Sequence, residues 1–299
     1  MAVLVTGAAG LIGNAVCRAL QSSGQAVIAI DRMAGTIEGV SVEACDVTNI
    51  HGLHAISRRH SLSGIIHCGA FSGPMVAADS PALMVDVNIV GTANVLELAR
   101  QAGGVRVVFC SSTSAVGPTS EGIHGEDIVL RPSSVYGASK AASEHLVRSY
   151  RLQHGVDGVS LRISWVYGPR RTTSCAIRQM LTDAMAGRTT QLPFGRDFPR
   201  QYIHVDDAVR GLLAALRAAN VPRHEYFVTG GTWMTLGEVA RAVREVVPQA
   251  RIDIAPGADP VDDWQGRFDI SAAERDLSYT PKVSLKDGIA RYRDWLASR

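Results

Sequence analysis

The sequence predicts an α/β fold, a doubly wound parallel β-sheet covered by helices. Three observations predict it. Short apolar runs alternate with segments of helical periodicity through the first half of the chain. A glycine-rich turn joins the first apolar run to the first helical segment, and an acidic residue directly follows the second apolar run. This order of elements is typical of proteins that bind a dinucleotide at a sheet edge.

Size and composition place the chain among ordinary globular proteins. The 299 residues are 46% hydrophobic and 19% charged, with a net charge of +2. No long basic run or membrane-length apolar run stands out, so we expect no nucleic-acid or membrane partner. The five cysteines are scattered without a CxxC pair, which predicts a reducing compartment, no disulfides and no zinc site. Because a strand is expected from residue 2, leaving no room for a signal peptide, we expect a cytoplasmic protein.

The first strand (residues 2–5) leads into a glycine turn, and a helix follows at residues 14–23. The glycines are spaced GxxGxxG, which suits a tight turn, a close approach of backbone to pyrophosphate, and packing of helix on strand. The N-terminus of the helix offers free N–H groups to phosphate. The cofactor-binding residues that we expect in this turn are Gly7, Gly10, Leu11, Ile12 and Gly13.

The second strand (residues 26–30) is followed by Asp31, eighteen residues beyond Gly13. A carboxylate there accepts hydrogen bonds from both ribose hydroxyls of adenosine but repels a 2′-phosphate, which favours NAD over NADP. The neighbouring Arg32 could accept that phosphate, so NADP is left open.

Strands and helices continue to alternate. A strand at residues 40–44 leads to Asp46 and Val47, and a helix is expected near residues 50–60. Its three histidines indicate an exposed face rather than a metal site, because no cysteine or carboxylate accompanies them at ligand spacing. The strand at residues 64–70 ends in a turn of small residues suited to close approach by a cofactor, namely Cys68, Gly69 and Ala70.

A long helix is expected at residues 81–101, carrying Asn88, and the strand at residues 105–110 runs directly into the hydroxyl cluster 111–114. In an open parallel sheet, ligands bind outside the carboxyl ends of the strands. The hydroxyl cluster, which includes Ser112, should therefore face the same crevice as the glycine turn. Serine-rich turns are otherwise common without any function.

The helix at residues 134–154 carries Tyr136 and Lys140, which are four residues apart and share one face. An ammonium beside a phenol favours the phenolate, which can take a proton from an alcohol or return one to a carbonyl. Alone, this pattern also fits an ordinary surface helix. The glycine turn and the hydroxyl of Ser112 upstream favour a catalytic interpretation, with Ser112 binding the substrate oxygen.

Taken together, these motifs resemble the extended short-chain dehydrogenase/reductase family, in its NAD-dependent epimerase/dehydratase branch. The resemblance implies a Rossmann NAD-binding domain and a smaller C-terminal α/β substrate lobe, with the active site between them. It also implies that paired helices near residues 81–101 and 134–154 form a homodimer. The matching segments are residues 6–13, 31, 46–47, 87–92, 109–117, 136–140, 161–169, 200–207 and 269–277.

The resemblance implies individual roles. Ser112 takes the place of the catalytic Ser/Thr, Tyr136 that of the general acid/base, and Lys140 that of its partner, which also holds the nicotinamide ribose. Further cofactor-binding positions are Asp46 and Val47 at the adenine, the turn 68–70, Asn88, and Tyr167 beside the nicotinamide.

The implied domain boundaries follow the change in pattern along the chain. Beyond residue 169 the alternation of strands and helices becomes irregular. We expect residues 1–168 to form the NAD-binding domain, with residues 200–220 returning to it. Residues 169–199 and 221–299, with helices near 235–246 and 284–297, are expected to form the substrate lobe.

Departures from the family pattern bear on the substrate. Trp165 stands where nucleotide-sugar enzymes commonly have an asparagine, and residues 258–260 (Ala-Asp-Pro) stand where they usually have a second arginine. Arg200 is kept. A diphosphate needs paired cationic donors, so these departures do not favour a nucleotide sugar and suit a free sugar or sugar acid. The expected substrate-binding residues are Ser112, Thr113, Trp165 and Arg200.

The expected function is that of an NAD-dependent sugar epimerase/oxidoreductase with Tyr136 as general acid/base. Elimination of water is disfavoured, because Thr113 and Ser114 replace the acid pair that 4,6-dehydratases carry there. A dehydrogenase of a free sugar or sugar acid, with net NADH formation, is the alternative. A non-catalytic NAD-binding regulator is less favoured, because Tyr136 and Lys140 are both present. The substrate is left open among sugars, sugar acids and nucleotide sugars.

Overall fold

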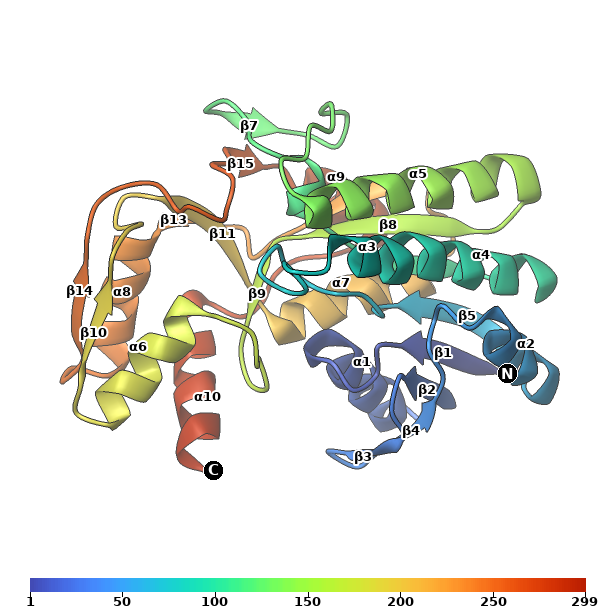
Figure 1. Cartoon of the computed structure of the whole chain (residues 1–299), viewed down its shortest axis with the longest axis horizontal. Helices are drawn as coiled ribbons and strands as arrows, with labels where there is room; N and C mark the ends of the chain where they lie inside the picture. Colours follow the sequence, from blue (N-terminus) through green and yellow to red (C-terminus); the bar gives the residue numbers. More distant parts are fainter.

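An eight-stranded sheet forms the centre of the computed structural model, which describes all of residues 1–299 (Figure 1). Its strand order is β12-β8-β6-β5-β1-β2-β4-β3, and every neighbouring pair except β3 with β4 is parallel. The predicted doubly wound α/β fold is therefore confirmed. The strands are β1 (Ala2–Thr6), β2 (Val27–Asp31), β3 (Gly35–Ile37), β4 (Val40–Ala44), β5 (Leu62–His67), β6 (Val107–Ser112), β8 (Gly158–Ile163) and β12 (Glu225–Val228).

The chain winds outward from β1 in both directions, so β2 and β5 lie on either side of it. The central strands are apolar and buried on both faces, as strands between two helical layers must be. Such a reversal of strand order leaves a crevice at the carboxyl ends of the strands, where ligands bind in open α/β sheets.

Helices cover both faces of the sheet. On one face, α1 (Leu11–Ser22), α7 (Val205–Arg217) and α9 (Ser271–Leu277) contribute to one apolar core. On the other face, α2 (Ile50–Arg59), α4 (Gly91–Gln101) and α5 (Val135–His154) contribute to a second core. Each helix buries one apolar stripe against the strands, which is the main source of its stability.

The helix expected at residues 81–101 is continuous but irregular. It consists of α3 (Pro81–Val85), a wider π-helical turn η1 (Asp86–Val90) and α4. Its length of 21 residues and mean hydropathy of 1.4 are sufficient for a membrane span, which corrects our expectation that no apolar run approaches that length. Within its most apolar stretch, 44% is buried inside the protein. Packing of α4 in the second core accounts for part of this apolar character.

The second lobe is built from short strands and three helices that share a separate core. One small sheet has the order β13-β11-β9, and another pairs β10 with β14. These elements are β9 (Trp165–Tyr167), β10 (Thr189–Leu192), β11 (Pro199–His204), β13 (Trp233–Thr235), β14 (Arg251–Ile254), α6 (Ala176–Met185), α8 (Leu236–Val246) and α10 (Leu285–Ala297). Figure 1 shows this lobe beside the carboxyl ends of the main sheet.

Two short segments return from the predicted lobe to the main sheet. Strand β12 pairs with β8, and α9 packs in the core formed with α1 and α7. Assigning all of residues 221–299 to the substrate lobe is therefore wrong for these segments. A strand of four residues carries too little periodicity to show which sheet it joins. A further two-stranded pair links β7 (Ile123–His124) to β15 (Arg267–Phe268).

Candidate active site

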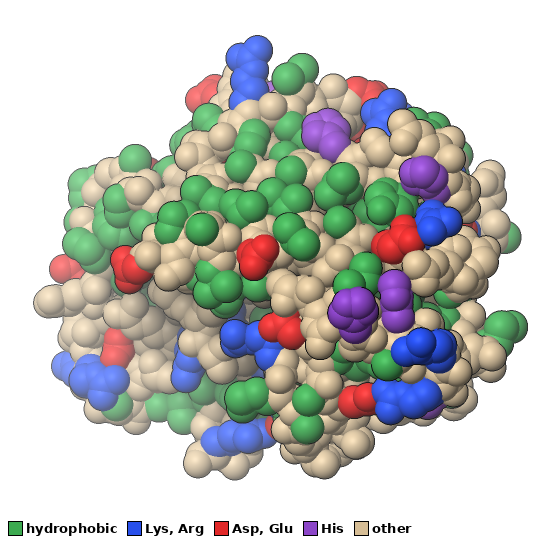
Figure 2. All heavy atoms as spheres, turned by 45° about the vertical axis from the view of Figure 1, so that its right-hand side comes forward, with side chains coloured by type: hydrophobic (Ala, Val, Ile, Leu, Met, Phe, Trp, Pro, Cys, Tyr) green, Lys and Arg blue, Asp and Glu red, His purple; other side chains and the backbone are tan.

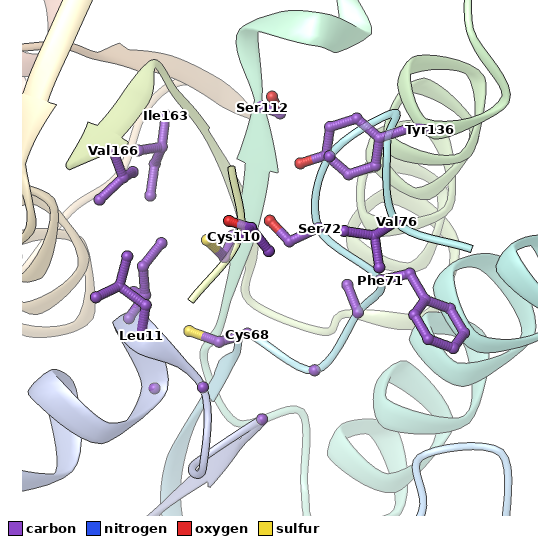
Figure 3. Close-up of a pocket in the computed structure, with 18 of the residues that line it drawn as sticks. Leu11, Cys68, Phe71, Ser72, Val76, Cys110, Ser112, Tyr136, Ile163 and Val166 are labelled. Carbon is purple, nitrogen blue, oxygen red and sulfur yellow. The ribbon is translucent and has the colours of Figure 1, made fainter. Parts of the chain in front are cut away.

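A cavity of about 360 Å³ opens at the carboxyl ends of β1, β5 and β6. It extends from the glycine turn past Asp31 to Ser112, Tyr136 and Lys140. Figure 3 shows Leu11, Ile163 and Val166 on one wall, with Ser72, Val76 and Tyr136 on the opposite wall. The fold therefore brings the expected cofactor turn and the expected catalytic residues to one cavity.

Two positions of the glycine turn, Gly7 and Gly13, leave no room for a side chain. Gly7 has a φ of +67°, and a Cβ on it would lie 2.7 Å from the backbone nitrogen of Gly69. A Cβ on Gly13 would lie 2.1 Å from the carbonyl oxygen of Gly7. Helix α1 begins directly after this turn, and no side chain caps its first N–H groups. The turn thus presents bare backbone and the positive end of a helix, which fits a pyrophosphate.

Backbone N–H groups fix the carboxylate of Asp31 at the end of β2. Its Oδ2 accepts a hydrogen bond from the Ala9 nitrogen at 3.0 Å, and its Oδ1 accepts one from the Arg32 nitrogen at 2.7 Å. Each carboxylate oxygen has a further lone pair, so Asp31 fits a pair of ribose hydroxyls. The guanidinium of Arg32 lies 5.7 Å from the ring centre of Phe71.

Helix α5 carries Tyr136 and Lys140 into the cavity. The side chain of Ser134 caps this helix by accepting from the Gly137 nitrogen at 3.1 Å. A Cβ on Gly137 would lie 2.3 Å from the Ser114 carbonyl oxygen, so only glycine lets the helix approach the turn after β6 this closely. As a result, the Tyr136 oxygen points into the cavity that Ser112 also lines (Figure 3).

Lys140 is buried and held beside the Tyr136 ring. Its Nζ donates to the Cys110 carbonyl oxygen at 2.8 Å and lies 5.8 Å from the Tyr136 ring centre. The Ser112 hydroxyl accepts from the Ser114 nitrogen at 3.1 Å and lies 3.2 Å from the Ser114 hydroxyl. This arrangement places an ammonium, a phenol and a serine hydroxyl on the wall of one cavity.

A buried ion pair supports this wall from behind. Glu144, one helical turn beyond Lys140, accepts from the Ser111 hydroxyl at 2.6 Å and from Arg162 Nη2 at 2.9 Å. The pair ties α5 to β6 and β8. Sequence patterns did not predict this pair, although an arginine inside the apolar strand β8 was a signal that a buried partner was needed.

His67, at the end of β5, is a neutral, buried residue that does not line the cavity. Burial, and secondly the charge of Lys140, lower the pKa of His67 to about 3. Thr92 donates its hydroxyl hydrogen to the Asn88 carbonyl, so it accepts from His67 Nε2 at 3.1 Å. The other ring nitrogen, Nδ1, accepts from the Thr6 hydroxyl at 2.7 Å.

Three predicted site residues do not line the main cavity. Asn88 lies behind it, where its amide bonds the backbone nitrogen and oxygen of Phe71 at 2.8 and 3.1 Å. Tyr167 is buried in the second lobe, with its hydroxyl 3.4 Å from the Leu285 carbonyl oxygen. Arg200 lies at a separate small cavity, bound to carboxylates of the chain. The other predicted residues all line the main cavity.

Lining residues that were not predicted include those of the loop 71–76, Ile163, Ser164, Val166, and residues 171–173. The loop follows β5 at the carboxyl edge of the sheet, so its position was a usable signal. Residues 171–173 come from the start of the second lobe, and only tertiary folding brings them here. Among acidic residues, only Asp31 and Asp46 line the cavity; Asp31 ends β2, and Asp46 lies just beyond β4.

Comparison with known proteins agrees with this geometry. The sequence model of the NAD dependent epimerase/dehydratase family matches residues 3–230. A UDP-glucuronate 4-epimerase of Thermodesulfobacterium geofontis is 27% identical over 312 residues, covering 98% of this chain and 95% of the relative. A UDP-glucose 4-epimerase of Streptomyces lividans is 31% identical over 282 residues, covering 86% and 85%.

A solved structure with the same fold also carries the cofactor. The crystal structure of a Thermus thermophilus UDP-glucose 4-epimerase in complex with NAD is 30% identical and has a TM-score of 0.88. The similarity covers 99% of both chains. The chain therefore belongs to the NAD-dependent epimerase/dehydratase family of extended short-chain dehydrogenases/reductases, and it is an enzyme whose cofactor is NAD.

Proposed function

We propose that this enzyme transfers a hydride reversibly at a secondary alcohol of a sugar or sugar derivative, with Tyr136 as the general acid/base. The observation that carries the proposal is the shared cavity of the glycine turn, Ser112, Tyr136 and Lys140. Tyr136 takes the proton of the alcohol while Ser112 holds the reacting oxygen by a hydrogen bond. NAD, held by the glycine turn and Asp31, would supply the hydride acceptor. The ammonium of Lys140 stabilises the phenolate form of Tyr136.

The distribution of acids in the cavity favours hydride transfer alone over elimination of water. Elimination requires an acid and a base beside the reacting carbon. The residues next to Ser112 in the cavity wall are Thr113 and Ser114, and no carboxylate accompanies them. We therefore do not propose a dehydratase, although some relatives at 26–29% identity are dTDP-glucose 4,6-dehydratases.

The two relatives are a UDP-glucuronate 4-epimerase and a UDP-glucose 4-epimerase. Their activities favour a sugar substrate and epimerisation through a ketone, with NAD tightly bound. The alternative is a dehydrogenase that releases NADH. One measurement separates the two reactions. An epimerase forms the epimer without a net rise in NADH absorbance, whereas a dehydrogenase accumulates NADH when excess NAD is supplied.

Tyr136→Phe tests the assignment of the base. We expect turnover to fall at least about 1,000-fold while the Kd for NAD changes less than about threefold, since only the proton-transferring atom is removed. Tyr150→Phe is the matched control, because Tyr150 lies on the same helix and outside the cavity. It should retain full activity. Substantial turnover by Tyr136→Phe would reject the proposal.

We also propose a cytoplasmic homodimer. All five cysteines are free, as a reducing compartment requires. Figure 2 shows hydrophobic side chains gathered across one face of the molecule. Exposed apolar residues of the adjacent elements α3, η1 and α5 include Leu83, Val85, Val90 and Val135. Light scattering should give the mass of two chains, and a monomer at working concentration would contradict the dimer.

A further inference from the structure

The guanidinium of Arg200, on β11, is already bound by two carboxylates of this chain. Its Nε donates to Asp262 Oδ2 at 2.8 Å, and its Nη2 donates to Asp259 Oδ2. Only 8% of Arg200 is exposed. One cation thus faces two carboxylates, so the cluster carries a net negative charge. A phosphate that approached Arg200 would have to displace both carboxylates and would be repelled by them.

Aromatic rings enclose the same guanidinium. The ring centre of Trp165 lies 4.6 Å from its central carbon, and that of Phe198 lies 5.0 Å away. Both distances are within the range of a cation–π interaction. Trp165 lines the main cavity as well as the small cavity at Arg200, so its indole forms part of the partition between them.

The segment that carries the two aspartates is hydrogen-bonded to residues between β6 and α5. Gln265 donates from its amide to the carbonyl oxygens of Thr113 and Gly117, both at 2.9 Å. The neighbouring Asp263 accepts from the Ser133 hydroxyl at 2.6 Å. The cavity left beside Arg200 is about 10 Å³, which is enough for one water molecule.

Ser164 is a second part of the partition between the two cavities, and its hydroxyl is not used by the protein. It lines both cavities and is 7% exposed, and its hydroxyl has no hydrogen-bond partner. A buried hydroxyl without a partner is unfavourable, and this one is closed to solvent, so a bound molecule gains its hydrogen bond by turning the Ser164 side chain toward the main cavity. Hydroxyls of Ser112 and Thr113 line the same end of the main cavity. These groups fit the hydroxyls of a small sugar.

We propose that the substrate is a small polyhydroxylated alcohol without a nucleotide diphosphate, and that Ser164 recognises one of its hydroxyls. This inference rests on the proposed function. Asp259 and Asp262 neutralise the arginine that a diphosphate would need. Arg200 is then a structural residue that fixes the wall of the substrate site.

Binding of UDP provides the test. The NAD-loaded enzyme is titrated with UDP and UDP-glucose in a calorimeter, and we expect a Kd weaker than about 1 mM for both. In Asp259→Asn/Asp262→Asn, the amides keep the shape but release the charge of Arg200. UDP should then bind at least about tenfold more tightly than to the unchanged enzyme. Asp197→Asn/Asp253→Asn removes two exposed carboxylates of the same lobe and should change nothing.

Two results would overturn the inference. One is a micromolar Kd for UDP or UDP-glucose in the unchanged enzyme. The other is a folded Asp259→Asn/Asp262→Asn variant, checked by its thermal transition, that gains no affinity for UDP. If that variant does not fold, the titration of the unchanged enzyme still decides whether the site binds a nucleotide diphosphate.

Turnover gives a second readout. A panel of free sugars, sugar acids and UDP-sugars should yield NADH or an epimer only from compounds without a nucleotide. With such a substrate, Ser164→Ala should raise KM about tenfold and leave the Kd for NAD unchanged. Turnover of a UDP-sugar, or an unchanged KM, would count against the inference. Absence of all turnover would count against the proposed function, whereas the UDP titration requires no turnover and decides the substrate class independently.

Discussion

The main cavity and the small cavity at Arg200 differ in whether the protein itself supplies partners for their polar groups. At the glycine turn, the N–H groups that begin α1 have no side-chain cap, and the Asp31 carboxylate is held only by backbone N–H groups. At the small cavity, Arg200 is bound to Asp259 and Asp262. The main cavity is about 360 Å³ and the small cavity about 10 Å³.

The difference shows how one can separate a ligand-binding group from a structural one. Groups that bind a ligand keep hydrogen-bonding capacity that the protein does not use, and they border open space. Groups that support the fold have their partners within the chain. The resemblance of a residue such as Arg200 to a family position does not by itself show which of the two applies.

The largest effect on cofactor binding is expected from Gly13→Ala in the glycine turn. A Cβ there would lie 2.1 Å from the Gly7 carbonyl oxygen, so the turn must move away from the phosphate position. We expect the affinity for NAD, measured by calorimetry, to fall at least about 100-fold. Gly35→Ala is the control, because nothing lies within 4 Å of its Cβ position. An affinity for NAD within threefold of the original would contradict the role of this turn.

The pH dependence of stability should arise from His67, which is buried at the end of β5. His67 has its pKa lowered from 6.5 to about 3 by burial, so its contribution to stability is fully present above pH 6.5 and is lost as the pH falls toward 3. The loss is at most about 5 kcal/mol, at about 1.4 kcal/mol for each pH unit.

Urea unfolding at a series of pH values measures this contribution. The variant His67→Gln should be less stable at pH 7 and lose less free energy of unfolding between pH 6.5 and 4.5. His60→Gln, at an exposed position after α2, should keep the original slope. If the free energy of unfolding of His67→Gln changed with pH as steeply as that of the original protein, another group would be responsible for the pH dependence.

A third prediction concerns the ion pair behind Lys140. Glu144 and Arg162 have side chains that are 1% and 4% exposed. Glu144→Gln leaves the Arg162 charge buried without a counter-charge, so we expect a loss of about 3 kcal/mol in the free energy of unfolding. Glu97→Gln, in a pair with Arg100 at the surface of α4, should cost about 1 kcal/mol or less. Equal losses in the two variants would show that burial does not distinguish these pairs.

The smallest effect is a change in cofactor preference. Asp31→Ser removes the charge that repels a 2′-phosphate and leaves Arg32 beside it. The ratio of the Kd for NADP to that for NAD should fall at least about tenfold. Glu43→Gln, on the neighbouring strand β4, should leave the ratio unchanged because Glu43 does not line the cavity. A constant ratio in Asp31→Ser would remove Asp31 from ribose recognition.

Local patterns were enough to predict much of this protein. Gly7, Gly13 and Asp31 lie within one βαβ unit, so their relation follows from the order of adjacent elements. Tyr136 and Lys140 lie on one helix, where a spacing of four residues fixes a shared face. The parallel order of the strands then places both groups at one sheet edge.

Contacts between distant segments were decided only by the tertiary structure. No local pattern could show that Asp259 and Asp262 meet Arg200 across about 60 residues, or that Ser164 is left without a partner. The same holds for β12, whose four residues pair with β8. The sequence by itself determined the fold class and the cofactor turn, because local spacing sets backbone geometry. The tertiary structure decided which charged groups remain available to a ligand, because neutralisation depends on distant residues that only packing brings together.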